Sequence, residues 1–194
     1  MGTTQPIKEA EQINALKDFY IMTKPNYRNY ALICLGINSA LRISDLLSLK
    51  WEHVYDFGRQ RYKKHIMITE KKTKKKTMIA INSGATEGLE LYRKSLGDTL
   101  SGKSFIFPGR WGDEGPLSRS QAFRIIKKAA NELHFEEGIS CHSLRKTFGY
   151  HAWKRGVHPA VLTEIYNHSS YQVTRRYLGI NQDDKDNIFL KVNL

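Results

Sequence analysis

The chain has 194 residues, of which 40% are hydrophobic, enough to bury a core within one domain or at most two small ones. It carries 31 Lys and Arg against 19 Asp and Glu, a formal net charge of +12, which favours nucleic acid as a partner over an anionic membrane surface or plain solubility. No stretch approaches the roughly eighteen apolar residues of a membrane span and no signal peptide is evident, so we expect a cytoplasmic protein.

Helical periodicity dominates the first third of the chain. Three segments carry apolar residues at helical spacing: the one with Ile13, Leu16 and Tyr20, residues 27–37, and residues 43–49. The second segment ends near the small-residue turn Asn38-Ser39-Ala40. We therefore expect helices over these segments.

A β-hairpin is predicted in the next stretch. Residues 62–69 and 77–81 are β-branched and apolar, a composition typical of strands. Between them lies the basic run Lys71-Lys72-Thr73-Lys74-Lys75-Lys76. The pattern predicts two antiparallel strands with a basic tip, and hence a small sheet.

The second half of the chain contains further helices and one more strand. The first is an amphipathic helix through Ala85, Leu89, Tyr92 and Leu96, followed by a short strand at 105–107 that is closed by Pro108 and a Gly-rich loop through Gly115. The capping box of Ser118 and Gln121 then opens another helix. The last is a helical stretch over 141–178, broken at Gly156 and Pro159 and capped at Ser170. The expected fold is one α+β domain over residues 1–194, mostly α, a helical bundle with a small antiparallel β-sheet.

The two cysteines, Cys34 and Cys141, lie in apolar or element-forming segments. In a reducing compartment such thiols usually behave as small buried hydrophobes. We expect no disulfide, and no structural zinc site, because no histidines stand at zinc-finger spacing.

The most informative segment for chemistry is Cys141-His142-Ser143-Leu144-Arg145-Lys146-Thr147. On a helix, His142 and Arg145 project from one face, because they are three residues apart. An arginine fork can bond two phosphate oxygens, and a histidine can add a hydrogen bond or move a proton. Taken alone, the pair is equally compatible with a solvated helix face.

The rest of the constellation favours the phosphate site. Upstream stands Ala40-Leu41-Arg42-Ile43-Ser44-Asp45-Leu46, and downstream His168 precedes Tyr177 by nine residues. In this respect the chain resembles the tyrosine recombinase (phage integrase) family, with its G/A-L-R-x-x-E/D-L motif, hairpin lysine, H-x-L-R motif, G-H motif and nucleophilic tyrosine. The matching residues are Arg42, Lys72, His142, Arg145, His168 and Tyr177. The resemblance covers residues 27–179 and implies the catalytic fold of that family.

The match departs from the family pattern at two positions and leaves one choice open. Asn167 stands where the family usually has Gly before the second histidine, and Ala80 where the second hairpin strand often has Pro. Lys72 is preferred within the basic run because the family's hairpin lysine commonly precedes Thr. Lys71 and Lys74 are the alternatives.

The resemblance implies a mechanism for each residue. Tyr177 attacks the scissile phosphate to form a 3′-phosphotyrosyl intermediate, and His142 assists the proton transfer from the tyrosine. Arg42, Arg145 and His168 stabilise the developing charge. Lys72 protonates the departing 5′-oxygen.

The mechanism needs neither ATP nor a cofactor. Covalent capture conserves the phosphodiester energy, and arginine charge can replace divalent metals. No carboxylate cluster suited to Mg²⁺ is apparent in the sequence, so we expect metal independence. Asp45, one turn after Arg42, is interpreted as orienting or supporting that arginine, with a catalytic role for Asp45 as the alternative. For Arg42, the alternative to a catalytic role is a surface ion pair with Asp45.

The resemblance also implies double-stranded DNA as the partner and a homotetramer on DNA, with a monomer as the alternative for the free protein. The tail, residues 188–194, alternates apolar and polar residues at its end, which suits docking on another subunit or in cis. We expect no separate N-terminal core-binding domain. Two rival functions are a type IB topoisomerase, which rejoins the original strand, and a helical DNA-binding regulator, which would not need Tyr177 beside two arginines and two histidines.

Overall fold

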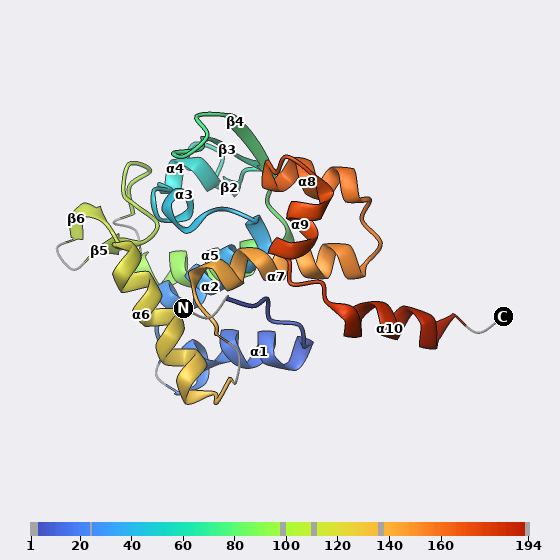
Figure 1. Cartoon of the computed structure of the whole chain (residues 1–194). Coiled ribbons are helices and arrows are strands. Elements are labelled where there is room, and N and C mark those ends of the chain that lie inside the picture. Colours follow the sequence, from blue (N-terminus) through green and yellow to red (C-terminus); the bar gives the residue numbers. More distant parts are fainter. Residues whose placement is uncertain (1–3, 24, 98–99, 110–111, 136–137, 193–194) are drawn as a thin grey trace.

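The computed structural model describes residues 4–23, 25–97, 100–109, 112–135 and 138–192, and helices predominate in them (Figure 1). The helices are α1 (Ala10–Asp18), the π-helix η1 (Phe19–Thr23), α2 (Tyr27–Ser39), α3 (Ile43–Leu47), α4 (Trp51–Val54), α5 (Ser83–Leu96), α6 (Arg119–Glu132), α7 (Cys141–Lys154), α8 (Pro159–Tyr166), α9 (Tyr171–Tyr177) and α10 (Gln182–Lys191). The strands are β1 (Tyr55–Asp56), β2 (Arg61–Tyr62), β3 (His65–Thr69), β4 (Lys76–Ala80), β5 (Pro108–Gly109) and β6 (Gly112–Pro116). The predicted class, α+β and mostly α, is confirmed.

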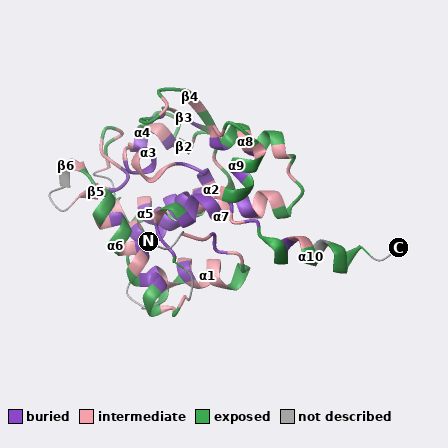
Figure 2. Ribbon diagram, in the orientation of Figure 1, coloured by how far each residue is buried: buried purple, intermediate pink, exposed green. Residues whose placement is uncertain are grey.

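Helix α2 lies at the centre of the fold, and residues 29–36 along it are buried (Figure 2). Helices α5 and α7 both pack against it. At Gly88, on α5, an added Cβ would lie 2.5 Å from the Cβ of Cys34, so glycine is what permits α5 to approach α2 this closely. The segment that carries Arg42 follows directly from the end of α2.

The predicted helix boundaries coincide with local caps. The Ser118 hydroxyl accepts from the Gln121 backbone N–H, and the Gln121 side chain accepts from the Ser118 N–H, as the capping box requires. Gly156 ends α7 with a positive φ of 82°, and Pro159 is the first residue of α8. The side chain of Ser170 caps α9, the helix that carries Tyr177.

The β structure differs in part from the prediction. Instead of one small sheet, the described residues contain three two-stranded antiparallel sheets, β1-β2, β3-β4 and β5-β6. The hairpin is confirmed as β3-β4, with His65 opposite Ala80 and Thr69 opposite Lys76. The predicted strand at 105–107 is wrong, because Phe105 forms only an isolated bridge to Lys50. Ile106 and Phe107 are buried but lie in a bend, and three apolar residues do not distinguish such a segment from a strand.

The predicted Gly-rich loop contains β5 and β6, and its residues 110 and 111 lie outside the described part of the chain. Cys34 is buried and Cys141 partly buried, and both are free thiols. Burial raises the pKa of each thiol to about 11. None of the described helices is both long enough and apolar enough to cross a membrane.

Helices α7, α8 and α9, with the turn between α8 and α9, carry four of the six predicted site residues. Their shared core consists of Ala40, Tyr150, Leu162, Tyr166, Leu178 and Ile180. After α9 the chain turns into α10, which projects away from the body of the molecule (Figure 1). The hairpin β3-β4 lies next to α8, at the end of the molecule opposite α1 (Figure 1).

Candidate active site

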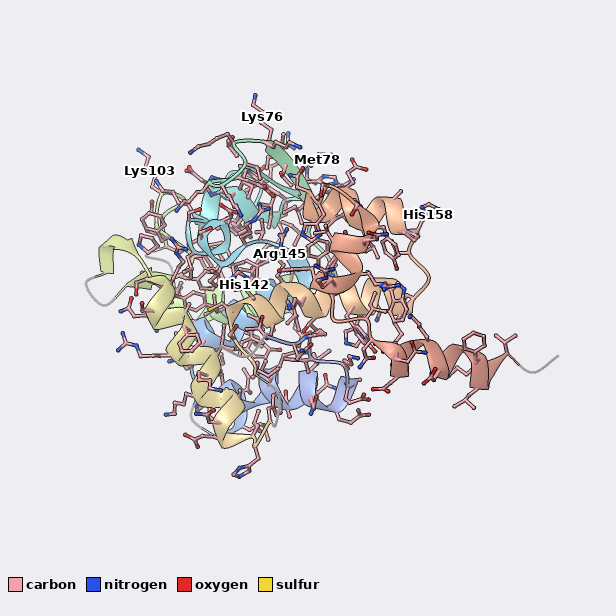
Figure 3. All side chains as sticks on the ribbon, viewed as in Figure 1. Lys76, Met78, Lys103, His142, Arg145 and His158 are labelled. Carbon is pink, nitrogen blue, oxygen red and sulfur yellow. The ribbon has the colours of Figure 1, made fainter. Side chains whose placement is uncertain are left out.

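Arg145 is a buried arginine in the middle of the molecule, with 5% of its surface exposed (Figure 3). Its guanidinium donates hydrogen bonds to the carbonyl oxygens of Ala40 and Tyr166 and lies 4.6 Å from the centre of the Tyr166 ring. Ala40 caps the C-terminus of α2 in the left-handed conformation, with a φ of 53°. Burial lowers the pKa of Arg145, but a guanidinium keeps its charge in proteins. The site therefore contains a fixed positive charge.

Arg42 supplies a second charge next to the first. It is the N-cap residue of α3, two residues after Ala40. Its Nη1 donates to Glu70 Oε2 at 2.6 Å, and 19% of the Arg42 side chain is exposed against 4% of the Glu70 side chain. Burial is the main cause of the lowered pKa of Arg145, and the charge of Arg42 lowers it further. The two guanidinium groups therefore place positive charge in the same region of the site.

Tyr177 lies against this pair of charges at the end of α9. Its ring centre is 5.1 Å from that of His168 and 5.4 Å from that of Tyr166, and the His168 contact is edge-on. Burial raises the pKa of the Tyr177 phenol. Arg145, through its charge and a hydrogen bond, and the charge of Arg42 oppose that rise. The phenol is thus half-buried and directed at the arginines.

His168 is held in place from both sides. Its Nδ1 lies 3.0 Å from the Thr174 hydroxyl, and its backbone N–H donates to the Thr163 carbonyl at 3.0 Å. Burial and the charges of Arg145 and Arg42 lower the pKa of His168, which keeps its imidazole neutral near pH 7. A neutral ring with Nδ1 engaged leaves Nε2 for a ligand.

The turn before His168 keeps its shape despite its unusual residue. Asn167 adopts the left-handed conformation, with φ 56° and ψ 43°, as the C-cap of α8. Asparagine is one of the few residues besides glycine that visits this region routinely. Replacing glycine by Asn167 therefore preserves the turn, and it adds a side chain whose Oδ1 accepts from Lys75 Nζ at 2.7 Å.

The two remaining predicted residues are more exposed. His142 is the second residue of α7 and is exposed, one turn before Arg145 (Figure 3). Burial, followed by the charges of Lys146, Arg145 and Arg119, lowers the pKa of His142. Lys72 is exposed in the turn between β3 and β4, as are Lys71 and Lys74. The structure thus brings Arg42, Arg145, His168 and Tyr177 together and leaves His142 and Lys72 at the rim.

Sequence reasoning missed Glu70, which is the carboxylate that pairs with Arg42. The alternative of an ion pair between Arg42 and Asp45 is wrong, because Arg42 pairs with Glu70 instead. Asp45 Oδ1 accepts from the backbone N–H of Lys71 at 2.9 Å, and its Oδ2 is buried without a hydrogen-bond partner. The signal for Glu70 was present as a lone acid at the end of a strand, directly before the basic run.

This arrangement has the groups that phosphate chemistry requires. Two fixed guanidinium charges can bind the nonbridging oxygens of a phosphodiester, a neutral imidazole can donate one more hydrogen bond, and a phenol stands ready as a nucleophile. Within the described part of the chain, no group of three or more His, Cys, Asp or Glu side chains could hold a metal ion. Metal independence itself stays a prediction.

Comparison with known proteins gives consistent results. The model of the phage integrase family matches residues 8–183. The chain is 41% identical over 183 residues to the probable integrase/recombinase YoeC of Bacillus subtilis (strain 168), covering 94% of this chain and 93% of that protein. Other curated relatives are tyrosine recombinases, and the chain spans about half of their length.

Solved structures show the same fold. A crystal structure of XerA recombinase superposes with a TM-score of 0.77 at 17% identity, covering 100% of this chain and 67% of that one. XerH site-specific recombinase, bound to palindromic difH substrate in a post-cleavage complex, gives a TM-score of 0.73 at 16% identity, covering 97% of this chain and 53% of that one. The second of these neighbours is thus a site-specific recombinase bound to its substrate.

Proposed function

The chain belongs to the phage integrase family of tyrosine recombinases, and from this premise we propose that it cuts and rejoins DNA strands through a covalent bond to Tyr177. The observation that carries the proposal is the position of Tyr177. Its ring packs against His168, and the charges of Arg145 and Arg42 act to lower the pKa of its phenol. A tyrosine whose role is only to pack in the core would not require two arginines beside its phenol.

The charges explain how a phosphodiester could react here. The diester is anionic and a poor electrophile, so attack requires preorganised positive charge where the pentavalent transition state becomes more negative. Arg145 provides that charge from a buried position and Arg42 from a partly buried one, both hydrogen-bonded, and His168 adds a donor. Their hydrogen bonds to Glu70 and Ala40 hold the guanidinium groups before substrate arrives.

Protons move on both sides of the phosphorus. Tyr177 Oη attacks the phosphorus and its proton passes to His142, while the bond between phosphorus and the 5′-oxygen breaks and Lys72 gives that oxygen a proton. The result is a 3′-phosphotyrosyl bond and a free 5′-hydroxyl. A second 5′-hydroxyl reverses the step, so rejoining needs no ATP and no metal.

The partner in this proposal is double-stranded DNA, and the active assembly is a homotetramer formed on it. The net charge of +12 supports a polyanionic partner. Helix α10 supports docking between subunits, because Phe189, Leu190 and Val192 near its end are exposed at 79%, 81% and 59%. Residues 193 and 194 of the predicted docking tail lie outside the described part of the chain. In this assembly residues 1–194 act as the catalytic domain.

A suicide substrate tests the proposal. Nicked duplexes that tile the DNA flanking the gene would be incubated with the protein and run on a denaturing gel. A covalent protein–DNA adduct supports a tyrosine recombinase, and exchange between two sites separates it from a type IB topoisomerase. Binding without any adduct would instead leave a DNA-binding regulator.

A further inference from the structure

The turn that carries Lys72 is closed by its own backbone. Glu70 N–H donates to the Lys75 carbonyl at 2.9 Å, and Lys74 N–H donates to the Glu70 carbonyl at 2.9 Å. Within the described residues, the ammonium group of Lys72 has no hydrogen-bond or ion-pair partner. The direction of this exposed side chain therefore depends on how the turn beneath it is held.

A buried carboxylate holds the residue that follows Lys72. Glu70 is 3% exposed, and its Oε2 accepts from the Thr73 hydroxyl at 2.5 Å. The same oxygen accepts from Arg42 Nη1 at 2.6 Å. One carboxylate thus connects the turn of the hairpin to an arginine of the active site.

A second buried carboxylate holds the residue that precedes Lys72. Asp45 is 1% exposed, lies in α3, and its Oδ1 accepts from the backbone N–H of Lys71 at 2.9 Å. Both chain neighbours of Lys72 are therefore tied to acids that are themselves fixed against the segment of Arg42.

We propose that Glu70 and Thr73 are positioning residues, which hold the turn so that Lys72 reaches the leaving 5′-oxygen when Arg42 reaches the phosphate. This inference rests on the proposed function. Positioning a lysine on a mobile turn against a single oxygen atom costs conformational entropy of both backbone and side chain. A turn that is already fixed lowers the backbone part of that cost. Glu70 Oε2 accepts a hydrogen bond from both Thr73 and Arg42. A movement of either donor would therefore shift this oxygen and alter the hydrogen bond to the other donor.

The Thr73 hydroxyl isolates the link to the turn from the link to Arg42. Thr73→Val keeps the size and branching of the side chain and removes only the hydroxyl, whereas Thr73→Ser keeps the hydroxyl. The matched control is Thr69→Val in the same hairpin, since the Thr69 hydroxyl has no hydrogen bond within the described residues. Lys72→Ala serves as the reference for complete loss of the proton donor.

Each variant would be given two nicked duplexes from the DNA flanking the gene, with oxygen or with sulfur at the bridging 5′ position of the mapped cleavage site. Sulfur departs without protonation, so it replaces the general acid. With oxygen, Thr73→Val should form adduct about tenfold more slowly than wild type, within the roughly hundredfold cost of a misplaced catalytic group. With sulfur it should approach the wild-type rate. Thr73→Ser should retain most of the wild-type rate, and Thr69→Val should be unchanged.

Glu70→Gln adds an independent check, because it weakens both links at once. It should slow cleavage of both substrates, and sulfur should restore only part of the rate, since a displaced Arg42 still lowers charge stabilisation. If Glu70→Gln does not fold, the Thr73 variants decide the question by themselves.

The outcomes separate this inference from the proposed function. If Lys72→Ala is rescued by sulfur and Thr73→Val is either as fast as wild type or not rescued, the positioning role is wrong and the recombinase proposal stands. If Lys72→Ala forms adduct but is not rescued by sulfur, the general acid lies elsewhere and this inference falls with that role. If wild type forms no adduct with any duplex, the proposed function itself fails.

Discussion

Opposing influences act on Tyr177. Burial raises the pKa of its phenol, which protects the resting enzyme from an ionised nucleophile, while Arg145 and Arg42 lower it. The same arginines lower the pKa of His168 after the larger effect of burial. The site therefore favours negative charge beside the two arginines and keeps the rings of Tyr177 and His168 neutral.

Replacing Tyr177 by phenylalanine should abolish covalent attachment to DNA, because only the phenolic oxygen is lost. The affinity for DNA should stay within about threefold of wild type, since phosphate contacts dominate binding. Adduct formation on the nicked duplexes and a binding titration at fixed salt measure the two effects. Adduct at the wild-type level in Tyr177→Phe would refute the assignment of the nucleophile.

Chelation provides a test of the arginine charges. If Arg42 and Arg145 stabilise the transition state, excess EDTA should leave the rate of adduct formation within about twofold of the untreated rate. The measurement is a time course on the nicked duplex with and without EDTA. Loss of cleavage that Mg²⁺ restores would point to metal-assisted hydrolysis instead.

At the scale of elements, the site depends on how closely α7 approaches α8 and α9. Gly149 lies on the face of α7 where they meet. An added Cβ there would stand 2.5 Å from Leu178 Cδ2 and 2.5 Å from the Tyr166 hydroxyl. That hydroxyl donates to the Arg145 carbonyl at 2.6 Å. A change in packing at Gly149 would therefore affect the positions of both Arg145 and α9, the helix that carries Tyr177.

Gly149→Ala should consequently destabilise the protein and slow cleavage. Overpacking of this kind costs about 1–3 kcal/mol, which for a chain of this size lowers Tm by about 2–4 °C per kcal/mol. Thermal unfolding followed by circular dichroism measures the loss. Gly115→Ala is a suitable control, because a Cβ there meets nothing within 4 Å. Equal Tm values for the two variants would contradict the packing argument.

On the scale of the whole molecule, three histidines with lowered pKa values link folding to pH. The pKa values of His142, His151 and His168 are all lowered from 6.5, mainly by burial, and nearby positive charge lowers them further. For His151, the hydrogen bond to the Ile7 carbonyl opposes part of that shift. Below the ordinary pKa the unfolded chain binds protons that the folded one resists. Their contribution to stability is complete above about pH 6.5 and is lost as the pH falls through the lowered values.

We therefore expect Tm to decrease between about pH 7.5 and about pH 5.5. The measurement is a series of thermal melts at constant ionic strength. His151 lies outside the catalytic cluster and its Nε2 is 3.0 Å from the Ile7 carbonyl, so His151→Gln should flatten the slope without removing a site residue. A Tm that is constant or rises over this interval would overturn the expectation.

Much of the fold followed from local rules, because caps and periodicity act over a few residues. The box of Ser118 and Gln121, the glycine at 156 and the proline at 159 each mark a helix end that the structure confirms. The segment at 105–107 did not follow, because its burial comes from distant parts of the chain and not from pairing along a strand.

The motifs that predict Arg42, Arg145, His168 and Tyr177 as the reactive groups were readable from the sequence alone. The structure brings these four side chains together, and their catalytic roles stay predictions. Which acid supports which base was not readable. Asp45 is one helical turn from Arg42, yet Glu70, 28 residues away, forms the ion pair, because the fold places the end of β3 beside the start of α3. Residue types and spacing therefore predicted the chemistry, whereas hydrogen-bond partners between segments far apart in the chain were decided only by tertiary packing.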